Sequence, residues 1–239
     1  SGRFSPRSLI DTNPGFVKVG TKTIEDKHNY GVMDLATILA KSSNVGAVEV
    51  SMKLDREMLW NTLSHFGAGR LTASGYPGES AGMLPPYKGW RPISQATMAF
   101  GYGLSMTPLQ LAQAYGVLAG DGLYRPVSLI RVERPPIARR VVSPETARSV
   151  VAMLEQVVSE EGTGQKATVT GYRVAGKTGT ARKVAAGGYA DDRHTAVFAG
   201  IAPVTTPRVV VVEPTWTLES GAVLSWRRVA GFLDPRIPF

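Results

Sequence analysis

The order in which helical and strand-like patterns follow one another is the feature that most limits the fold of this 239-residue chain. Helical patterns come early, and strand-like runs come late, at 127–133, 138–142, 173–182, 194–202 and 208–213. Strict alternation of strands and helices would predict parallel βαβ units, whereas this order predicts a sheet flanked by helices. We therefore expect an α/β fold of the α+β type, and no linker divides the chain into independent domains.

The early helical patterns cover three segments, 33–41, 45–54 and 55–66. Asp55 is the expected N-cap of the third segment, which stops before Gly67. Around these helices, residues 9–32 are expected to be extended and rich in turns, as at Asn13-Pro14-Gly15. Residues 67–92 are expected to form a long surface loop, and such loops are often functional.

Two later helices have clear start signals. Thr107-Pro108 and Ser143-Pro144 each place an N-cap residue before a proline at the first helical position. The inward positions predicted for the first are Leu109, Ala112, Tyr115 and Leu118, and for the second Val150, Val151, Leu154 and Val158.

Composition excludes several classes of function. The chain has no cysteine, and its three histidines are widely separated, so we expect no metal and no cofactor. The formal net charge of +8 could favour a polyanion, but the aromatic residues do not interleave with basic clusters, so we expect no nucleic-acid partner. No run reaches the roughly 18 apolar residues of a membrane span. Because the first residue is Ser1 and no signal region follows, we expect the chain to begin within a longer protein.

Residues 171–178 match the phosphate-binding loop of nucleotide hydrolases. Such a loop must follow a buried strand and open a helix, whose N-terminus holds the phosphate. Here polar, turn-like residues precede the motif and no helical pattern follows it. A nucleotide hydrolase, which would need magnesium, therefore remains only an alternative.

Lys177-Thr178-Gly179 is better explained as part of a strand at the edge of an active site. Gly179 lets a peptide-like substrate lie along the backbone, and the Thr178 hydroxyl can bind a carboxylate. Lys177 supplies positive charge that attracts this carboxylate. The backbone N–H of Thr180 is a candidate oxyanion donor.

Ser42-Ser43-Asn44 lies between two predicted helices and is the expected companion of this strand. A turn there can direct Ser42 Oγ and the Asn44 amide into one cleft. Ser42 would relay a proton between a general base and the leaving group, and Asn44 would hold the substrate's amide. A simple helix cap is the alternative interpretation of the same residues.

Ser-x-Asn followed by Lys-Thr-Gly is the order of motifs in penicillin-recognising serine enzymes. The surrounding sequence resembles the division-specific (septal) class B penicillin-binding proteins over about residues 1–212. The segments that carry the resemblance are 38–46, 75–79, 99–105, 107–112, 162–164, 175–183 and 198–200. The resemblance implies a penicillin-binding-protein and serine β-lactamase-like fold with an antiparallel sheet.

Two departures from this family stand out. No serine has lysine three residues on, so the Ser-x-x-Lys nucleophile and base are expected upstream of Ser1. As given, the chain is therefore expected to be inactive alone and not acylated by penicillin. Residues 213–239 diverge from the family, and we interpret this tail as read out of frame. A fold incomplete at both ends is expected to be only marginally stable.

By resemblance, the complete protein is a peptidoglycan D,D-transpeptidase of septal cell-wall synthesis. Its implied substrates are peptidoglycan stem peptides, its inhibitors are β-lactams, and its partners are a lipid-II polymerase and other division proteins. Its implied location is the periplasmic face of the inner membrane. A β-lactamase, a D,D-carboxypeptidase and a non-catalytic module that binds peptides remain alternatives.

Overall fold

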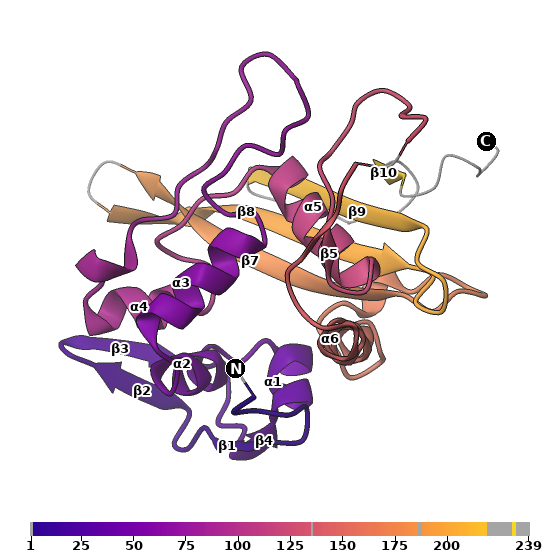
Figure 1. Cartoon of the computed structure of the whole chain (residues 1–239). Helices are drawn as coiled ribbons and strands as arrows, with labels where there is room; N and C mark the ends of the chain where they lie inside the picture. The colour runs from indigo at the N-terminus through magenta and orange to yellow at the C-terminus, as the bar shows by residue number, and fades with distance from the viewer. Residues whose placement is uncertain (1, 135, 186–187, 219–230, 233–239) are drawn as a thin grey trace.

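A computed structural model describes residues 2–134, 136–185, 188–218 and 231–232. Its largest sheet has the strand order β10-β9-β8-β7, and each neighbouring pair is antiparallel. The strands are β7 (Ala175–Ala185), β8 (Gly188–Ala202), β9 (Val209–Leu218) and β10 (Gly231–Phe232). Strand β7 lies at one edge of this sheet (Figure 1). The mixed fold with antiparallel sheets confirms the predicted fold class.

Two long helices pack against this sheet, α5 (Pro108–Ala119) and α6 (Pro144–Val157). Both begin where the sequence predicts, because Thr107 and Ser143 accept hydrogen bonds from backbone N–H groups of the first turn. At Thr107 the cap is reciprocal, since the Gln110 side chain accepts a hydrogen bond from the Thr107 backbone. These caps fix where each helix starts relative to the sheet.

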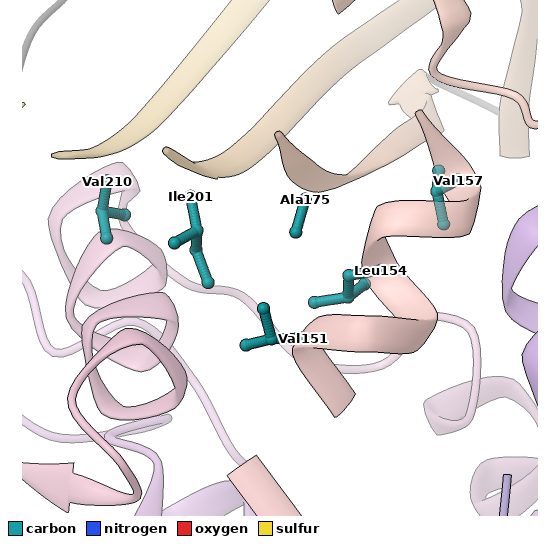
Figure 2. Packing of buried hydrophobic residues seen from close by; sticks show 6 residues of the cluster. All are labelled: Val151, Leu154, Val157, Ala175, Ile201 and Val210. Atoms are coloured by element: carbon teal, nitrogen blue, oxygen red, sulfur yellow. The ribbon is translucent and has the colours of Figure 1, made fainter. Parts of the chain in front are cut away.

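The core between α6 and the sheet is aliphatic. Figure 2 shows the side chains of the cluster directed toward one another from α6, β7, β8 and β9: Val151, Leu154, Val157, Ala175, Ile201 and Val210. All six are at most 6% exposed. Each larger aliphatic side chain contributes about 1.5–3 kcal/mol by leaving water. This packing holds α6 against β7, the strand that carries Lys177.

The predicted inward faces are confirmed for α6 and only in part for α5. In α6, Val151 and Leu154 are buried. In α5 the four predicted positions are half-buried, and the fully buried face consists of Gln110, Gln113, Ala114 and Val117. The Gln110 amide donates to the carbonyls of Arg70 and Ala81, at 2.6 and 2.8 Å. The helix therefore buries a polar face as well, which anchors the long loop.

The first half of the chain forms a separate layer of short elements beside the main sheet (Figure 1). Two hairpin-like pairs, β1 (Leu9–Asp11) with β4 (Val32–Asp34) and β2 (Phe16–Val19) with β3 (Lys22–Glu25), occupy the segment predicted as extended. The helices that follow are α1 (Leu35–Lys41), α2 (Asn44–Met52) and α3 (Arg56–His65). Asp55 is the N-cap residue of α3 but makes no capping hydrogen bond.

One prediction about the middle of the chain is confirmed and one is wrong. The long loop expected over 67–92 is present and contains a single 3-10 turn, η1 (Tyr87–Gly89). The helix that follows it, α4 (Pro92–Met98), was not predicted. No strand forms over 127–133; instead β5 (Leu123–Tyr124) pairs with β6 (Arg139–Arg140). No neighbouring strand covers the apolar residues of that run, and Ile130 is accordingly 79% exposed.

None of the helices in the described part of the chain is long and apolar enough to cross a membrane.

Candidate active site

The turn between α1 and α2 places Ser42 at the surface and Ser43 in the interior. Ser42 has a left-handed backbone, with φ of 58° and ψ of 43°. Its N–H donates to Leu39 O and the next N–H donates to Ile38 O, which is the Schellman pattern that closes a helix. A non-glycine residue in this conformation costs about 1 kcal/mol or more. The turn therefore holds the backbone of the exposed Ser42 in a conformation that an unconstrained chain would avoid.

Asp26 fixes the beginning of α2, a role that no sequence pattern indicates. Its carboxylate accepts a hydrogen bond from Ser43 Oγ and another from the Asn44 backbone N–H at 2.6 Å. Ser43 Oγ in turn accepts from the Gly46 N–H at 2.9 Å. A carboxylate at a helix N-terminus is favoured by the helix dipole. Asp26 and Ser43 thus set the position of Asn44 at the start of α2.

Lys177 and Ser42 meet across the space between strand β7 and the α1–α2 turn. Lys177 Nζ donates to Ser42 Oγ at 2.8 Å, although the two residues are 135 positions apart. Lys177 Nζ also lies 3.1 Å from the carbonyl oxygen of Thr178. The two predicted motifs, Ser-x-Asn and Lys-Thr-Gly, are therefore brought together by the fold.

Burial lowers the pKa of Lys177 to about 8, because the amine loses the water that would solvate its charge. None of the ion pairs formed among the described side chains involves Lys177. The Lys177 amine therefore loses its proton more readily than a solvent-exposed lysine does.

Thr163 connects the same strand to α1. Thr178 Oγ1 and Thr163 Oγ1 are 3.0 Å apart, and the Thr163 N–H donates to Ala40 O at 3.2 Å. Gly162 makes this turn possible, since a Cβ there would lie 2.1 Å from Val157 O. Sequence reasoning used 162–164 only as part of the resemblance and missed Thr163 as a contact of the site. The Gly162-Thr163-Gly164 pattern was the available signal.

A cavity of about 210 Å³ lies beside Thr178 on the face of the sheet that also carries Phe198 and Glu213. The 162–167 turn forms its other wall. A larger cavity of about 530 Å³ lies around α4 and η1, and none of the predicted site residues lines it. We assign the site from the hydrogen bond between Ser42 and Lys177 rather than from cavity size.

The remaining predicted residues lie close by in sequence and structure. Gly179 pairs with Val197 and Thr180 with Ala196 on β8, so both belong to the edge strand that carries Lys177. Thr180 is exposed and Asn44 is half-buried. Their individual roles stay predictions.

Among the described residues, no group of three or more histidine, cysteine, aspartate or glutamate side chains could hold a metal ion.

Comparison with known proteins identifies the class to which this fold and site belong. The family model for the penicillin binding protein transpeptidase domain matches residues 1–217. The chain therefore belongs to the penicillin-binding protein transpeptidase family, which confirms the predicted resemblance to the class B proteins.

Individual relatives support the same assignment. The chain is 41% identical over 219 residues to a probable peptidoglycan D,D-transpeptidase, PenA, of Neisseria meningitidis, covering 90% of this chain and 37% of the relative. The apo transpeptidase domain of penicillin-binding protein 3 from Burkholderia pseudomallei superposes with a TM-score of 0.87 at 42% identity, covering 90% of this chain and 66% of that one.

Penicillin-binding protein 3 of Mycobacterium tuberculosis, solved in complex with aztreonam, gives a TM-score of 0.84 at 37% identity, covering 91% of this chain and 53% of that one. The chain thus spans little more than a third of the length of the meningococcal relative.

Proposed function

We propose that this transpeptidase domain cross-links peptidoglycan by D,D-transpeptidation. In this reaction a serine is acylated by a donor stem peptide, the terminal D-alanine leaves, and an acceptor amine takes the acyl group. The observation that carries the proposal is the 2.8 Å contact between Lys177 Nζ and Ser42 Oγ in a chain of this family. It joins the two motifs that the chemistry needs.

Each site residue has a proposed role. Ser42 relays a proton between the general base and the leaving amine, and its bond to Lys177 supplies the path. The Thr178 hydroxyl, positioned by Thr163, binds the carboxylate of the substrate. The positive field of Lys177 assists this binding while the amine is protonated.

Substrate orientation is assigned to the remaining three residues. The Asn44 amide holds the peptide bond of the donor, and Gly179 leaves room for the donor to lie along the edge of the sheet. The Thr180 N–H stabilises the oxyanion. No serine of the chain has a lysine three residues later, so we assign the acylated serine and its base to a segment outside these 239 residues.

The setting of the reaction is also a proposal. The resemblance of the motifs to septal class B proteins supports a role in cell division, at the periplasmic face of the inner membrane. It also supports association with a lipid-II polymerase and other division proteins. Inhibition by β-lactams is supported by the mycobacterial relative, which was solved with aztreonam.

Acylation by labelled penicillin tests this function in the protein that the complete gene encodes. We expect a covalent label that is lost or slowed about 100-fold or more in Lys177→Ala, because the site loses its charge and its link to Ser42. Lys88→Ala is the matched control, since Lys88 lies in η1, which packs against α3. Absence of label on the folded wild-type protein, or equal labelling of both variants, would refute the proposal.

A further inference from the structure

The last two residues of α1, Ala40 and Lys41, are both bonded to the turn that follows α6. Helix α1 packs beside α6 (Figure 1). The Ala40 carbonyl accepts a hydrogen bond from the Thr163 N–H at 3.2 Å, and Lys41 Nζ donates to the Glu161 carbonyl at 3.0 Å. The end of α1 therefore holds this turn at two points, one on each side of Gly162.

Lys41 contacts the backbone of the turn more closely than it contacts the carboxylate of Glu161. Its Nζ lies 3.0 Å from the Glu161 carbonyl oxygen and 3.9 Å from the carboxylate. The Glu161 side chain is 88% exposed, so water screens the ion pair strongly. The hydrogen bond to the carbonyl is therefore the part of this contact that holds the turn in place.

The turn is tight, so its position at Glu161 also sets its position at Thr163. The Gly164 N–H donates to Val157 O at 2.7 Å, which ties the turn to the end of α6. A Cβ at Gly162 would lie 2.1 Å from the same oxygen, so the backbone of the turn lies directly against α6. Because the turn is held at α6 on one side and at α1 on the other, Thr163 has little freedom to shift.

The position of Thr163 decides what the Thr178 hydroxyl can do. The two Oγ1 atoms are 3.0 Å apart, and each hydroxyl has one proton to donate. When Thr163 donates to Thr178, the proton of Thr178 stays available for a substrate carboxylate. In the reverse arrangement, Thr163 takes up that proton. Recognition of the carboxylate therefore depends on where the turn holds Thr163.

We propose that Lys41 is a positioning residue for recognition of the substrate carboxylate. Through its hydrogen bond to the Glu161 carbonyl, Lys41 holds residues 161–163 against α1. Thr163 then stays where it can orient the Thr178 hydroxyl. This inference rests on the proposed function, in which Thr178 binds the carboxylate, and it adds a residue that does not itself touch the substrate.

Acylation by benzylpenicillin and by its methyl ester tests this role in the protein that the complete gene encodes. The two probes differ only in the carboxylate. Lys41→Met keeps an unbranched apolar side chain and removes the donor. We expect this variant to react about 5-fold more slowly with benzylpenicillin and at an unchanged rate with the methyl ester, because one hydrogen bond of this kind contributes about 2- to 10-fold.

Three further variants separate this contact from other effects. Lys41→Arg should react like the wild type, because the guanidinium keeps a donor for the carbonyl. Glu161→Ala should do the same, because the backbone carbonyl remains. Combining Lys41→Met with Thr163→Val should slow acylation no further than Thr163→Val alone, because both changes act through the same hydroxyl.

Hydrogen exchange followed by mass spectrometry tests the turn without any catalysis. The amides of residues 161–164 should exchange about 5-fold faster in Lys41→Met, whereas those of α5 should not change. Unchanged exchange in the turn would show that Lys41 does not hold it. Equal slowing with both penicillins, or slowing in Glu161→Ala, would overturn the role in carboxylate recognition. A folded wild-type protein that reacts with neither probe would refute the proposed function, and the carboxylate role of Lys41 with it.

Discussion

Gly176 is the position where a single methyl group should disturb the site strand most. A Cβ at Gly176 would lie 2.3 Å from Phe198 Cζ and 2.8 Å from the carbonyl oxygen of Ala199, whereas ordinary contacts begin near 3.4 Å. The Phe198 ring is 3% exposed and packs among Val158, Ala167 and Val174. It would have to move by about 1 Å into occupied space, or β7 would have to lift away from β8.

The expected cost of Gly176→Ala follows from this overpacking. Extra methyl groups in a packed core cost about 1–3 kcal/mol, which for a chain of this size lowers the Tm by about 2–12 °C. Without the clash, alanine would stabilise the strand by about 0.5–1 kcal/mol, so the two outcomes differ in sign. Thermal unfolding followed by circular dichroism measures the change.

Gly179→Ala is the matched control on the same strand. Its Cβ would meet Val197 Cγ1 at 2.9 Å, and this methyl group can rotate away. We expect a Tm change within about 2 °C for this variant. Phe198→Leu should recover part of the loss caused by Gly176→Ala, with a coupling of about 1 kcal/mol. An unchanged or raised Tm in Gly176→Ala, or equal losses in both glycine variants, would refute the reasoning.

Three further predictions follow from the same contacts. Asp26→Ala should lower the free energy of unfolding by about 1–2 kcal/mol in urea titrations, because α2 loses its N-terminal acceptor; no change would contradict this role. Thr163→Val should weaken penicillin acylation of the complete gene product by about 10-fold while Thr163→Ser retains it, because only the hydroxyl orients Thr178; equal rates would remove Thr163 from the site. The free energy of unfolding should rise between about pH 8 and 10.5, by up to about 3 kcal/mol more in the wild type than in Lys177→Met. In that window the unfolded chain binds a proton that the folded chain has released, whereas below it the cost of burying the charged amine is fully present. If the free energies of unfolding of the wild type and of Lys177→Met differ by the same amount at every pH, the folded-state pKa of Lys177 is not lowered.

Local signals in the sequence were sufficient for the elements whose ends are fixed by capping. Thr107-Pro108 and Ser143-Pro144 start α5 and α6 as predicted, because an N-cap followed by proline depends only on neighbouring residues. The three strands β7, β8 and β9 also lie where apolar runs predict them. Their antiparallel pairing came from the resemblance, since strand runs alone do not specify partners.

Features that depend on distant contacts were not predicted. The buried face of α5 includes Gln110 and Gln113, and glutamine is buried only where backbone carbonyls from elsewhere accept its hydrogen bonds. Asp26 lies in a segment predicted as extended, and only the fold brings it to the N-terminus of α2. The run 127–133 has strand-like composition, but no neighbouring strand covers it.

The residues of the candidate site were selected from sequence motifs, and the contacts among them were not predicted. Ser42 and Lys177 were selected separately by motif, and the 2.8 Å contact between them was not predicted. The bond between Thr163 and Thr178 was not anticipated, because a threonine between two glycines gives no indication of its partner. The divergent tail predicted over residues 213–239 lies largely outside the described residues and stays a prediction.

Release of D-alanine from a stem peptide ending in D-Ala-D-Ala tests the central claim most directly. The protein encoded by the complete gene should release D-alanine and, with an added acceptor amine, transfer the acyl group to it. Thr178→Val should lower this rate by about 100-fold or more, because the substrate carboxylate loses its hydroxyl partner. No release of D-alanine by the folded protein, or an unchanged rate in Thr178→Val, would contradict the assignment of this site to D,D-transpeptidation.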